Sequence, residues 1–187
     1  IIPSANCIEK HIAHHQLYPD SLLSGAANTD ESNAVSDVEQ YKVYMEKFWR
    51  TISSNGTQAL EVNFDNFIIT TANMSMTKAT FKKIGGFDET LRDGYDYEFG
   101  LRALEKNIAS YFDLNIETIH NDRITLRYYA KRQKCYMESK KIIFKKKPVY
   151  QELLNKENKR PSFVKKIIYK ILRNNRVVDF IETSELF

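Results

Sequence analysis

The amino-acid sequence predicts a mixed α/β domain followed by a basic helical extension. Apolar strand-like segments alternate with segments of helical periodicity over the first 130 residues. A composition of 42% hydrophobic and 28% charged residues is typical of a globular domain with its own core. The charge is uneven, because residues 131–176 hold 16 Lys or Arg and only three acidic residues. We therefore expect one domain over residues 1–130 and an extension over residues 131–187.

The N-terminal segment predicts a helix and then a strand. Ser4–Leu17 has helical spacing of its apolar residues, with Ile8 and Ile12 on one face. Ser21–Ala27 is short and apolar, which is typical of a strand. The polar residues 28–34 that follow predict a loop.

A capping box predicts where the second helix begins. Ser36 can accept a hydrogen bond from the backbone amide of Glu39, and the Glu39 carboxylate can reach back to the amide of Ser36. The helix should run to about Ile52, after which Asn55-Gly56 should form a turn. One side of this helix would carry Val38, Tyr41, Met45, Phe48 and Trp49.

The middle of the chain predicts two strands and two helices. Phe64–Met74 is apolar and β-branched, which favours a strand. Thr77–Ile84 predicts a short helix that ends at a left-handed Gly85. Ile108–Ile119 predicts another strand. Before it, Tyr95–Lys106 predicts a helix that offers for packing Phe99, Leu101 and Leu104.

An acidic region at a strand-to-helix junction is the most informative part of the chain. Five acidic residues stand within eleven positions: Asp88, Glu89, Asp93, Asp96 and Glu98. Asp96 and Glu98 open the predicted helix, where free amides favour negative charge, so both can be ordinary helix-start residues. So many acids also repel one another unless water, a cation or a hydroxylated ligand compensates them. Such a junction is where an α/β enzyme would keep a catalytic carboxylate.

Three motifs in this region resemble those of the family-2 glycosyltransferases, which have a GT-A-type fold. The motifs are Asn73-Met-Ser75 after a strand, Gly85-Gly-Phe-Asp-Glu89 after a short helix, and Asp96-Tyr-Glu98-Phe-Gly-Leu-Arg102. Their order and spacing match the family pattern, and the resemblance covers residues 1–130. It implies an α/β fold with a partial GT-A-like, Rossmann-like mixed sheet and flanking helices.

The resemblance implies that Asp96 is the general base. Its carboxylate would take the proton from an acceptor hydroxyl as that oxygen attacks the anomeric carbon of the donor sugar, with inversion. Glu98 would contact the acceptor or support the base, and Arg102 could pair with Glu98 at i+4. The sequence departs from the family pattern at Tyr95, which replaces a glutamate, so the acceptor preference could differ. The acceptor side would comprise Asn73, Gly86, Asp88, Glu98 and Arg102.

The resemblance also implies a nucleotide-sugar donor and a divalent cation. The family often has a histidine after the acidic helix, near the donor diphosphate, so His120 is a candidate ligand of Mn²⁺ or Mg²⁺ or of the pyrophosphate. By default, a lone histidine at a strand end is a surface or hydrogen-bonding residue. The family's Asp-x-Asp does not precede the acceptor motifs, and Ile1-Ile-Pro3 resembles the residues that follow it. We therefore expect the acceptor half of a longer enzyme, inactive by itself for lack of the donor-binding half, with a sheet edge that further strands would cover.

The activity implied is transfer of a sugar from a nucleotide sugar to a glycan or lipid-linked acceptor, in cell-surface polysaccharide synthesis. A second hypothesis is a catalytically incomplete, glycosyltransferase-like module that binds glycans or a protein partner. A third is an adaptor that binds a membrane surface or nucleic acid through residues 131–176. Without a signal peptide or an apolar run long enough to span a bilayer, the sequence predicts a cytoplasmic protein. Its basic residues 131–176 could place it at the inner face of the membrane.

The basic extension has a helical pattern broken at Pro148 and Pro161. Lysines stand beside apolar residues, first at Lys140, Lys141, Ile142, Ile143, Phe144, Lys145, Lys146 and Lys147, and again at Phe163, Lys165, Lys166, Ile167, Ile168, Lys170, Ile171, Leu172 and Arg173. Such helices can lie on an anionic membrane or pack their apolar faces on the domain, and both interpretations stay open. Nucleic acid is not an expected partner, because the sequence has no recognised binding module and no patterned aromatic platform.

Three histidines on the first predicted helix have the spacing of metal ligands. They are His11, His14 and His15. No carboxylate partner and no His-Glu-x-x-His pattern accompanies them. We therefore expect an ordinary, partly exposed helix here.

Overall fold

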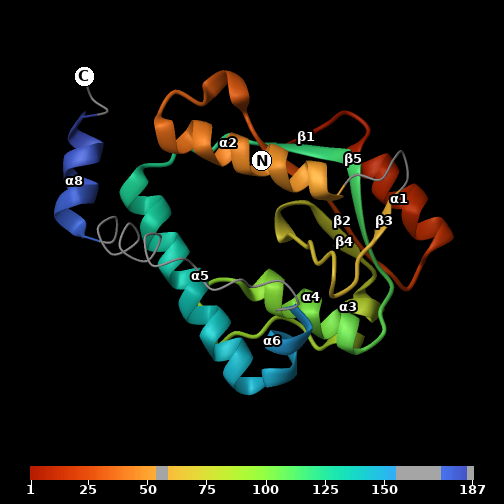
Figure 1. The fold of residues 1–187 in the computed structure, drawn as a ribbon. Helices are drawn as coiled ribbons and strands as arrows, with labels where there is room; N and C mark the ends of the chain where they lie inside the picture. Colours follow the sequence, from red (N-terminus) through yellow and green to blue (C-terminus); the bar gives the residue numbers. More distant parts are fainter. Residues whose placement is uncertain (54–58, 155–173, 185–187) are drawn as a thin grey trace.

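The computed structural model describes residues 1–53, 59–154 and 174–184 as an α/β fold with a mixed, curled sheet and flanking helices (Figure 1). The sheet order is β1-β5-β2-β4, and β3 pairs with β5 beside that path. β2 and β5 are parallel, and the other pairs are antiparallel. The strands are β1 (Ile2–Pro3), β2 (Leu22–Thr29), β3 (Leu60–Glu61), β4 (Met74–Met76) and β5 (Ser110–His120).

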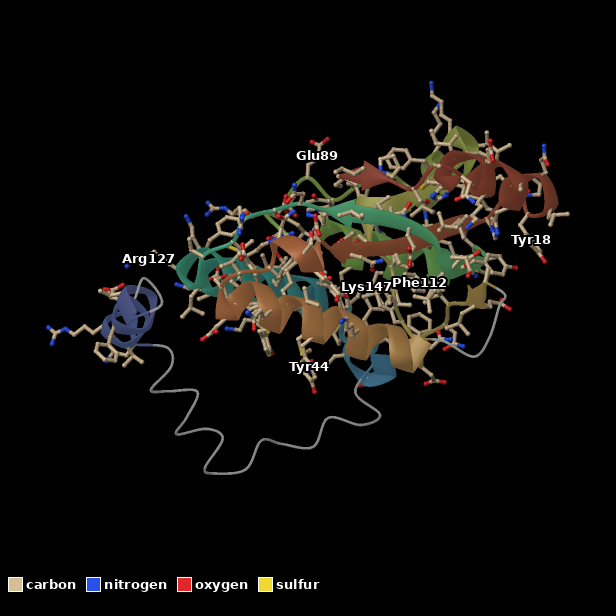
Figure 2. All side chains as sticks on the ribbon, turned by 90° about the horizontal axis from the view of Figure 1, so that it is seen from above. Tyr18, Tyr44, Glu89, Phe112, Arg127 and Lys147 are labelled. Atoms are coloured by element: carbon tan, nitrogen blue, oxygen red, sulfur yellow. The ribbon has the colours of Figure 1, made fainter. Side chains whose placement is uncertain are left out.

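Helices cover both faces of the central strands. They are α1 (Cys7–Leu17), α2 (Asp37–Ser53), α3 (Lys78–Ile84), α4 (Tyr95–Glu105), α5 (Leu126–Lys146), α6 (Pro148–Leu154) and α8 (Asn175–Ser184), with short 3-10 turns η1 (Glu31–Asn33) and η2 (Thr71–Asn73). Leu22 packs with Phe99 of α4, whereas the next residue, Leu23, packs with Cys7 of α1. Seen from above, Tyr44 of α2 points away from the sheet, while Phe112 of β5 lies in the core (Figure 2). Because both faces of β2 are covered, its sequence is apolar or small without polar alternation.

A register shift interrupts the pairing of β2 with β5. Gly25 lies opposite Asp113, but the next residue, Ala26, lies opposite Glu117. The Asn73 side chain enters this gap, and its Nδ2 donates hydrogen bonds to the carbonyl oxygens of Ala26 and Ile116, each at 2.9 Å. A Cβ on Gly25 would come within 2.4 Å of both Asn73 Nδ2 and the Ile116 oxygen. The register shift therefore requires a glycine at position 25 of β2 and a side chain from η2, here Asn73, that can donate two hydrogen bonds.

Several local predictions are confirmed. The Glu39 carboxylate accepts from the Ser36 amide at 3.1 Å, and Ser36 Oγ accepts from the Glu39 amide at 3.4 Å. Gly85 closes α3 with φ of 103°. α4 begins at Tyr95, and Phe99 on this helix is fully buried. These features were predictable because each depends on residues close together in sequence.

The predicted strand over Phe64–Met74 is wrong for most of its length, since only Met74 of this segment belongs to a strand. Asn63 Oδ1 accepts from the amides of Asp65 and Asn66 at 2.8 and 3.2 Å, and Asn66 Oδ1 accepts from the Asn63 amide at 2.6 Å. Side chains that bind the backbone in this way compete with strand pairing. Thr70 then caps the 3-10 turn through the Ala72 amide.

One further prediction on the N-terminal segment needs correction. Residues 28 and 29 belong to β2 rather than to a loop, because they pair with the end of β5. Ile8 and Ile12 share one face of α1, and that face is exposed, since the two residues are 69% and 55% exposed. The buried residue of this helix is Cys7, which packs against Leu23 and Ile116.

Residues 131–154 of the basic extension pack on the domain. Ile143 of α5 and Tyr150 of α6 are buried against Leu91 and Leu101. The predicted boundary at residue 131 falls inside α5, and α8 lies beside the start of that helix (Figure 1). For residues 126–154 this favours packing on the domain over binding to a membrane surface.

Some predictions cannot be compared with the structure. The Phe48 and Trp49 side chains, the Asn55-Gly56 turn, Pro161 and the second basic cluster over residues 163–173 lie outside the described residues. Among the helices that are described, none is both long enough and apolar enough to cross a bilayer.

Candidate functional site

A cavity of about 280 Å³ lies outside the carboxyl ends of the parallel strands β2 and β5. Helices α2 and α5 form its walls, with Lys42 and Glu46 from α2 and Tyr128, Arg132 and Tyr136 from α5. In open α/β sheets, ligands bind in the crevice beyond the carboxyl ends of the strands. This cavity is therefore the candidate functional site.

His120 is the last residue of β5 and lines the cavity. Its Nδ1 is buried and makes no hydrogen bond within the described residues. Asp122 places a carboxylate oxygen 2.6 Å from that nitrogen, close enough for an ion pair but not aligned for a hydrogen bond. A carboxylate at this position orients a ligating imidazole in many metal sites, which makes Asp122 a candidate positioning residue that the sequence did not reveal.

Asp96 lies in the first turn of α4, directly after the left-handed Gly94. Its Oδ1 accepts a hydrogen bond from the Tyr97 amide at 2.8 Å. Burial raises the pKa of the Asp96 carboxyl, and the nearby charge of Asp93 raises it further, against the main-chain hydrogen bonds that lower it. A carboxylate whose pKa is raised binds a proton more tightly than an ordinary one, which suits a general base.

Tyr136 connects the Asp96 turn with the cavity. It lines the cavity, and burial raises its pKa. The positive charge of Arg132 lowers this pKa, while the charges of Asp93 and Asp96 raise it. Arg132 contacts both Tyr136 and Asp93: its Cζ lies 5.4 Å from the centre of the Tyr136 ring, and its Nε lies 3.8 Å from Asp93 Oδ2. The charge of the predicted base thus acts on a side chain in the wall of the cavity that His120 lines.

Glu98, Arg102 and Gly86 form one network away from the cavity wall. Arg102 donates from Nε and Nη2 to the two Glu98 oxygens at 2.5 and 2.7 Å, which confirms the predicted pairing. The same guanidinium donates to the carbonyl oxygens of Ile84 at 2.9 Å and Gly86 at 2.5 Å. The pair therefore fastens the Gly85-Gly86 turn to α4, and its role in acceptor binding stays a prediction.

Asp88 and Asn73 are also engaged by the protein itself. Lys146 donates to Asp88 Oδ2 at 2.6 Å, Thr90 donates to Oδ1, and these bonds lower the pKa of Asp88 to about 2. Asn73 is buried in the gap between β2 and β5. Their assignment to the acceptor side likewise stays a prediction.

The residues that α5 contributes were missed because the sequence placed most of them in a separate extension. A signal was present, since Tyr128, Arg132 and Tyr136 recur at i, i+4 and i+8 and must share one face of a helix. That face looks into the cavity. Lys42 of α2 gave no comparable signal.

The described residues do not gather three or more His, Cys, Asp or Glu side chains into a metal site. His120 with the nearby Asp122 is a pair that fits a cation which also takes oxygens from a phosphate ligand. Any cation at this site would thus depend on the ligand for most of its coordination.

Comparison with known proteins leaves the family open. No protein-family model matches the chain, and no curated protein or solved structure matches it significantly.

Proposed function

We propose that this chain forms the acceptor side of an inverting glycosyltransferase, with Asp96 as its general base. The observation that carries the proposal is a partly buried carboxyl of raised pKa whose charge acts on Tyr136, a residue that lines a cavity at the carboxyl ends of parallel strands. The three sequence motifs around Asp96 support it independently. The substrates proposed are a nucleotide sugar and a glycan or lipid-linked acceptor.

In the proposed reaction, the Asp96 carboxylate accepts the proton of the acceptor hydroxyl while the oxygen of that hydroxyl bonds to the anomeric carbon of the donor sugar. The bond from that carbon to the nucleoside diphosphate breaks, and the diphosphate leaves with the electron pair. The hydrogen bond from the Tyr97 amide holds the carboxylate in one orientation. Positioned proton transfer of this kind contributes about 10²- to 10⁴-fold to a rate.

The cavity offers positive groups for the phosphates of a donor. Arg132 and Lys42 line it, and His120 stands at its edge on β5. A carboxylate is close to each of these two cations, Asp93 at 3.8 Å from Arg132 and Glu46 at 3.9 Å from Lys42. A bound Mg²⁺ or Mn²⁺ would neutralise the negative charge of the leaving diphosphate. His120 would be its protein ligand, with a carboxylate oxygen of Asp122 2.6 Å from the Nδ1 of this ring.

The proposal is tested with the protein as its cell makes it, using UDP-glucose, UDP-galactose and GDP-mannose with a lipid extract of that cell. Release of nucleoside diphosphate measures transfer. Asp96→Asn should lower the rate by about 10²- to 10⁴-fold and leave donor binding unchanged, because only the proton acceptor is lost. Normal turnover by this variant would remove Asp96 as the base.

Glu89→Gln is the matched control. It makes the same chemical change in the same acidic region, but Glu89 is exposed and points outward (Figure 2). We expect its rate to stay within twofold of the wild type. Glycan binding without turnover of any donor would instead support the binding-module hypothesis.

A further inference from the structure

We propose that His11 and His15 on α1 form a binding site for a transition metal ion such as Zn²⁺, separate from the cavity described above. Both side chains face Ser75 of β4 in an open depression of about 490 Å³. His11 Nδ1 lies 2.6 Å from Ser75 Oγ, and His15 Nε2 lies 2.7 Å from the same oxygen. Two imidazole nitrogens from successive helical turns therefore converge on one point.

The partner of His11 fixes which of its nitrogens carries the proton. Asn73 Nδ2 donates to two carbonyl oxygens, so the other end of that amide, which faces His11, is the oxygen. This oxygen lies 2.9 Å from His11 Nε2 and can only accept. In the neutral ring Nε2 carries the hydrogen, and Nδ1 presents its lone pair to Ser75.

The partner of His15 leads to the same result. His15 Nδ1 lies 3.4 Å from the carbonyl oxygen of Tyr18, which also can only accept. Nδ1 therefore carries the hydrogen when the ring is neutral. Nε2 then presents its lone pair to Ser75 Oγ.

The two lone pairs compete for a single hydrogen. The Ser75 hydroxyl can donate to one imidazole, which leaves the other nitrogen facing an oxygen at hydrogen-bond distance without a proton between them. A metal ion that accepts both lone pairs removes this conflict. Neutral imidazole is a preferred ligand of Zn²⁺, Cu²⁺ and Ni²⁺, and a protein oxygen on the other ring nitrogen is the usual support of such a ligand.

His14 does not belong to this site. Ser21 Oγ donates its hydrogen to the Tyr18 carbonyl oxygen at 2.6 Å, so it must accept from His14 Nε2 at 3.1 Å. The His14 nitrogen that has a partner is therefore a donor. This histidine on the same helix provides a matched control.

The experiment uses untagged full-length chain, stripped with chelator and titrated with ZnCl₂ at pH 7.5 by calorimetry. We expect one equivalent to bind to the wild type and to His14→Gln with dissociation constants within twofold of each other. His11→Gln and His15→Gln should each weaken Zn²⁺ binding at least tenfold, because each leaves one imidazole. Circular dichroism checks that every variant is folded.

Two further measurements separate a metal site from a hydrogen-bonding cluster. Ser75→Ala removes the shared hydroxyl but keeps both imidazoles, so it should bind Zn²⁺ within tenfold of the wild type. The ring ¹⁵N signals of His11 and His15, but not of His14, should shift when Zn²⁺ is added. Equal Zn²⁺ binding by the wild type and a His11→Gln/His15→Gln double variant would overturn the proposal, and unchanged ring signals would do the same.

Discussion

Replacing Asn73 with alanine should destabilise the protein strongly, because this side chain joins β2 to β5 where their register shifts. Asn73 Nδ2 donates to the carbonyl oxygens of Ala26 and Ile116, each at 2.9 Å, from a buried position. The Asn73→Ala variant leaves both oxygens without this donor. If Asn73 were mainly an acceptor-binding residue, the substitution would weaken ligand binding and leave stability unchanged.

The size of the effect follows from the remaining partners. The Ala26 oxygen also accepts from Thr118 Oγ1 at 3.3 Å, so its loss is partial, whereas the Ile116 oxygen loses its Asn73 donor outright. An unmade buried hydrogen bond costs about 1–3 kcal/mol, which gives a loss of about 2–4 kcal/mol for the two. With a urea slope of about 2 kcal/mol/M, the unfolding midpoint should fall by about 1–2 M.

Urea unfolding followed by circular dichroism at 222 nm measures this loss. The control is Asn33→Ala, which removes an exposed hydrogen bond to Asp30 and should change the unfolding free energy by less than about 0.5 kcal/mol. Gly25→Ala approaches the same gap from the other strand and should destabilise comparably, because its Cβ would come within 2.4 Å of Asn73 Nδ2. An Asn73→Ala variant as stable as the control would refute the reasoning.

Three other predictions concern the charged groups. The acidic limb of the pH–rate profile should fall at a higher pH than for an ordinary aspartate, because burial raises the pKa of Asp96 and the base must be unprotonated. An acidic limb at the pH of an ordinary aspartate would contradict this. Glu98→Gln should lower the unfolding free energy in urea by about 3 kcal/mol, since Arg102 keeps a half-buried charge without its carboxylate, and a neutral result would show that the pair is dispensable. The hydrogen bond from Lys146 is the largest of the interactions, with those from Thr90, that lower the pKa of Asp88 from 3.8 to about 2, so it stabilises the fold above pH 4 and less as the pH falls toward 2. Lys146→Met should therefore cost less than about 1 kcal/mol at pH 6, and the difference from the wild type should shrink toward pH 2; a difference independent of pH would rule out this linkage.

Local sequence signals predicted the features that depend on neighbouring residues. The capping box at Ser36 and the left-handed end of α3 at Gly85 form as expected, because each is decided within a few positions. The strand expected over residues 64–74 does not form for most of its length, because the side chains of Asn63 and Asn66 accept hydrogen bonds from nearby backbone amides and so compete with strand pairing.

The candidate site was only partly predictable. Asp96 and His120 stood out because their sequence surroundings resemble the motifs of a known family. Tyr136 did not, because its place beside Asp96 depends on how α5 folds back over α4, which no local spacing encodes. The gap that Asn73 fills was hidden for a similar reason, as it arises only when β2 and β5 pair out of register.

Helix α5 is held at both ends and lines the cavity with residues between them, which limits the insertions and deletions that it can tolerate. Its 21 residues span about 31 Å, from the Thr125 cap to Lys146 on Asp88. One residue inserted after Tyr136 would turn everything beyond it by about 100° and take Ile143 out of the core while the cavity face stayed in place. A one-residue deletion there would turn the rest of the helix by about 100° in the opposite direction and would also take Ile143 out of the core. Among related sequences, the length of α5 between Thr125 and Lys146 should therefore be constant even where its residues differ.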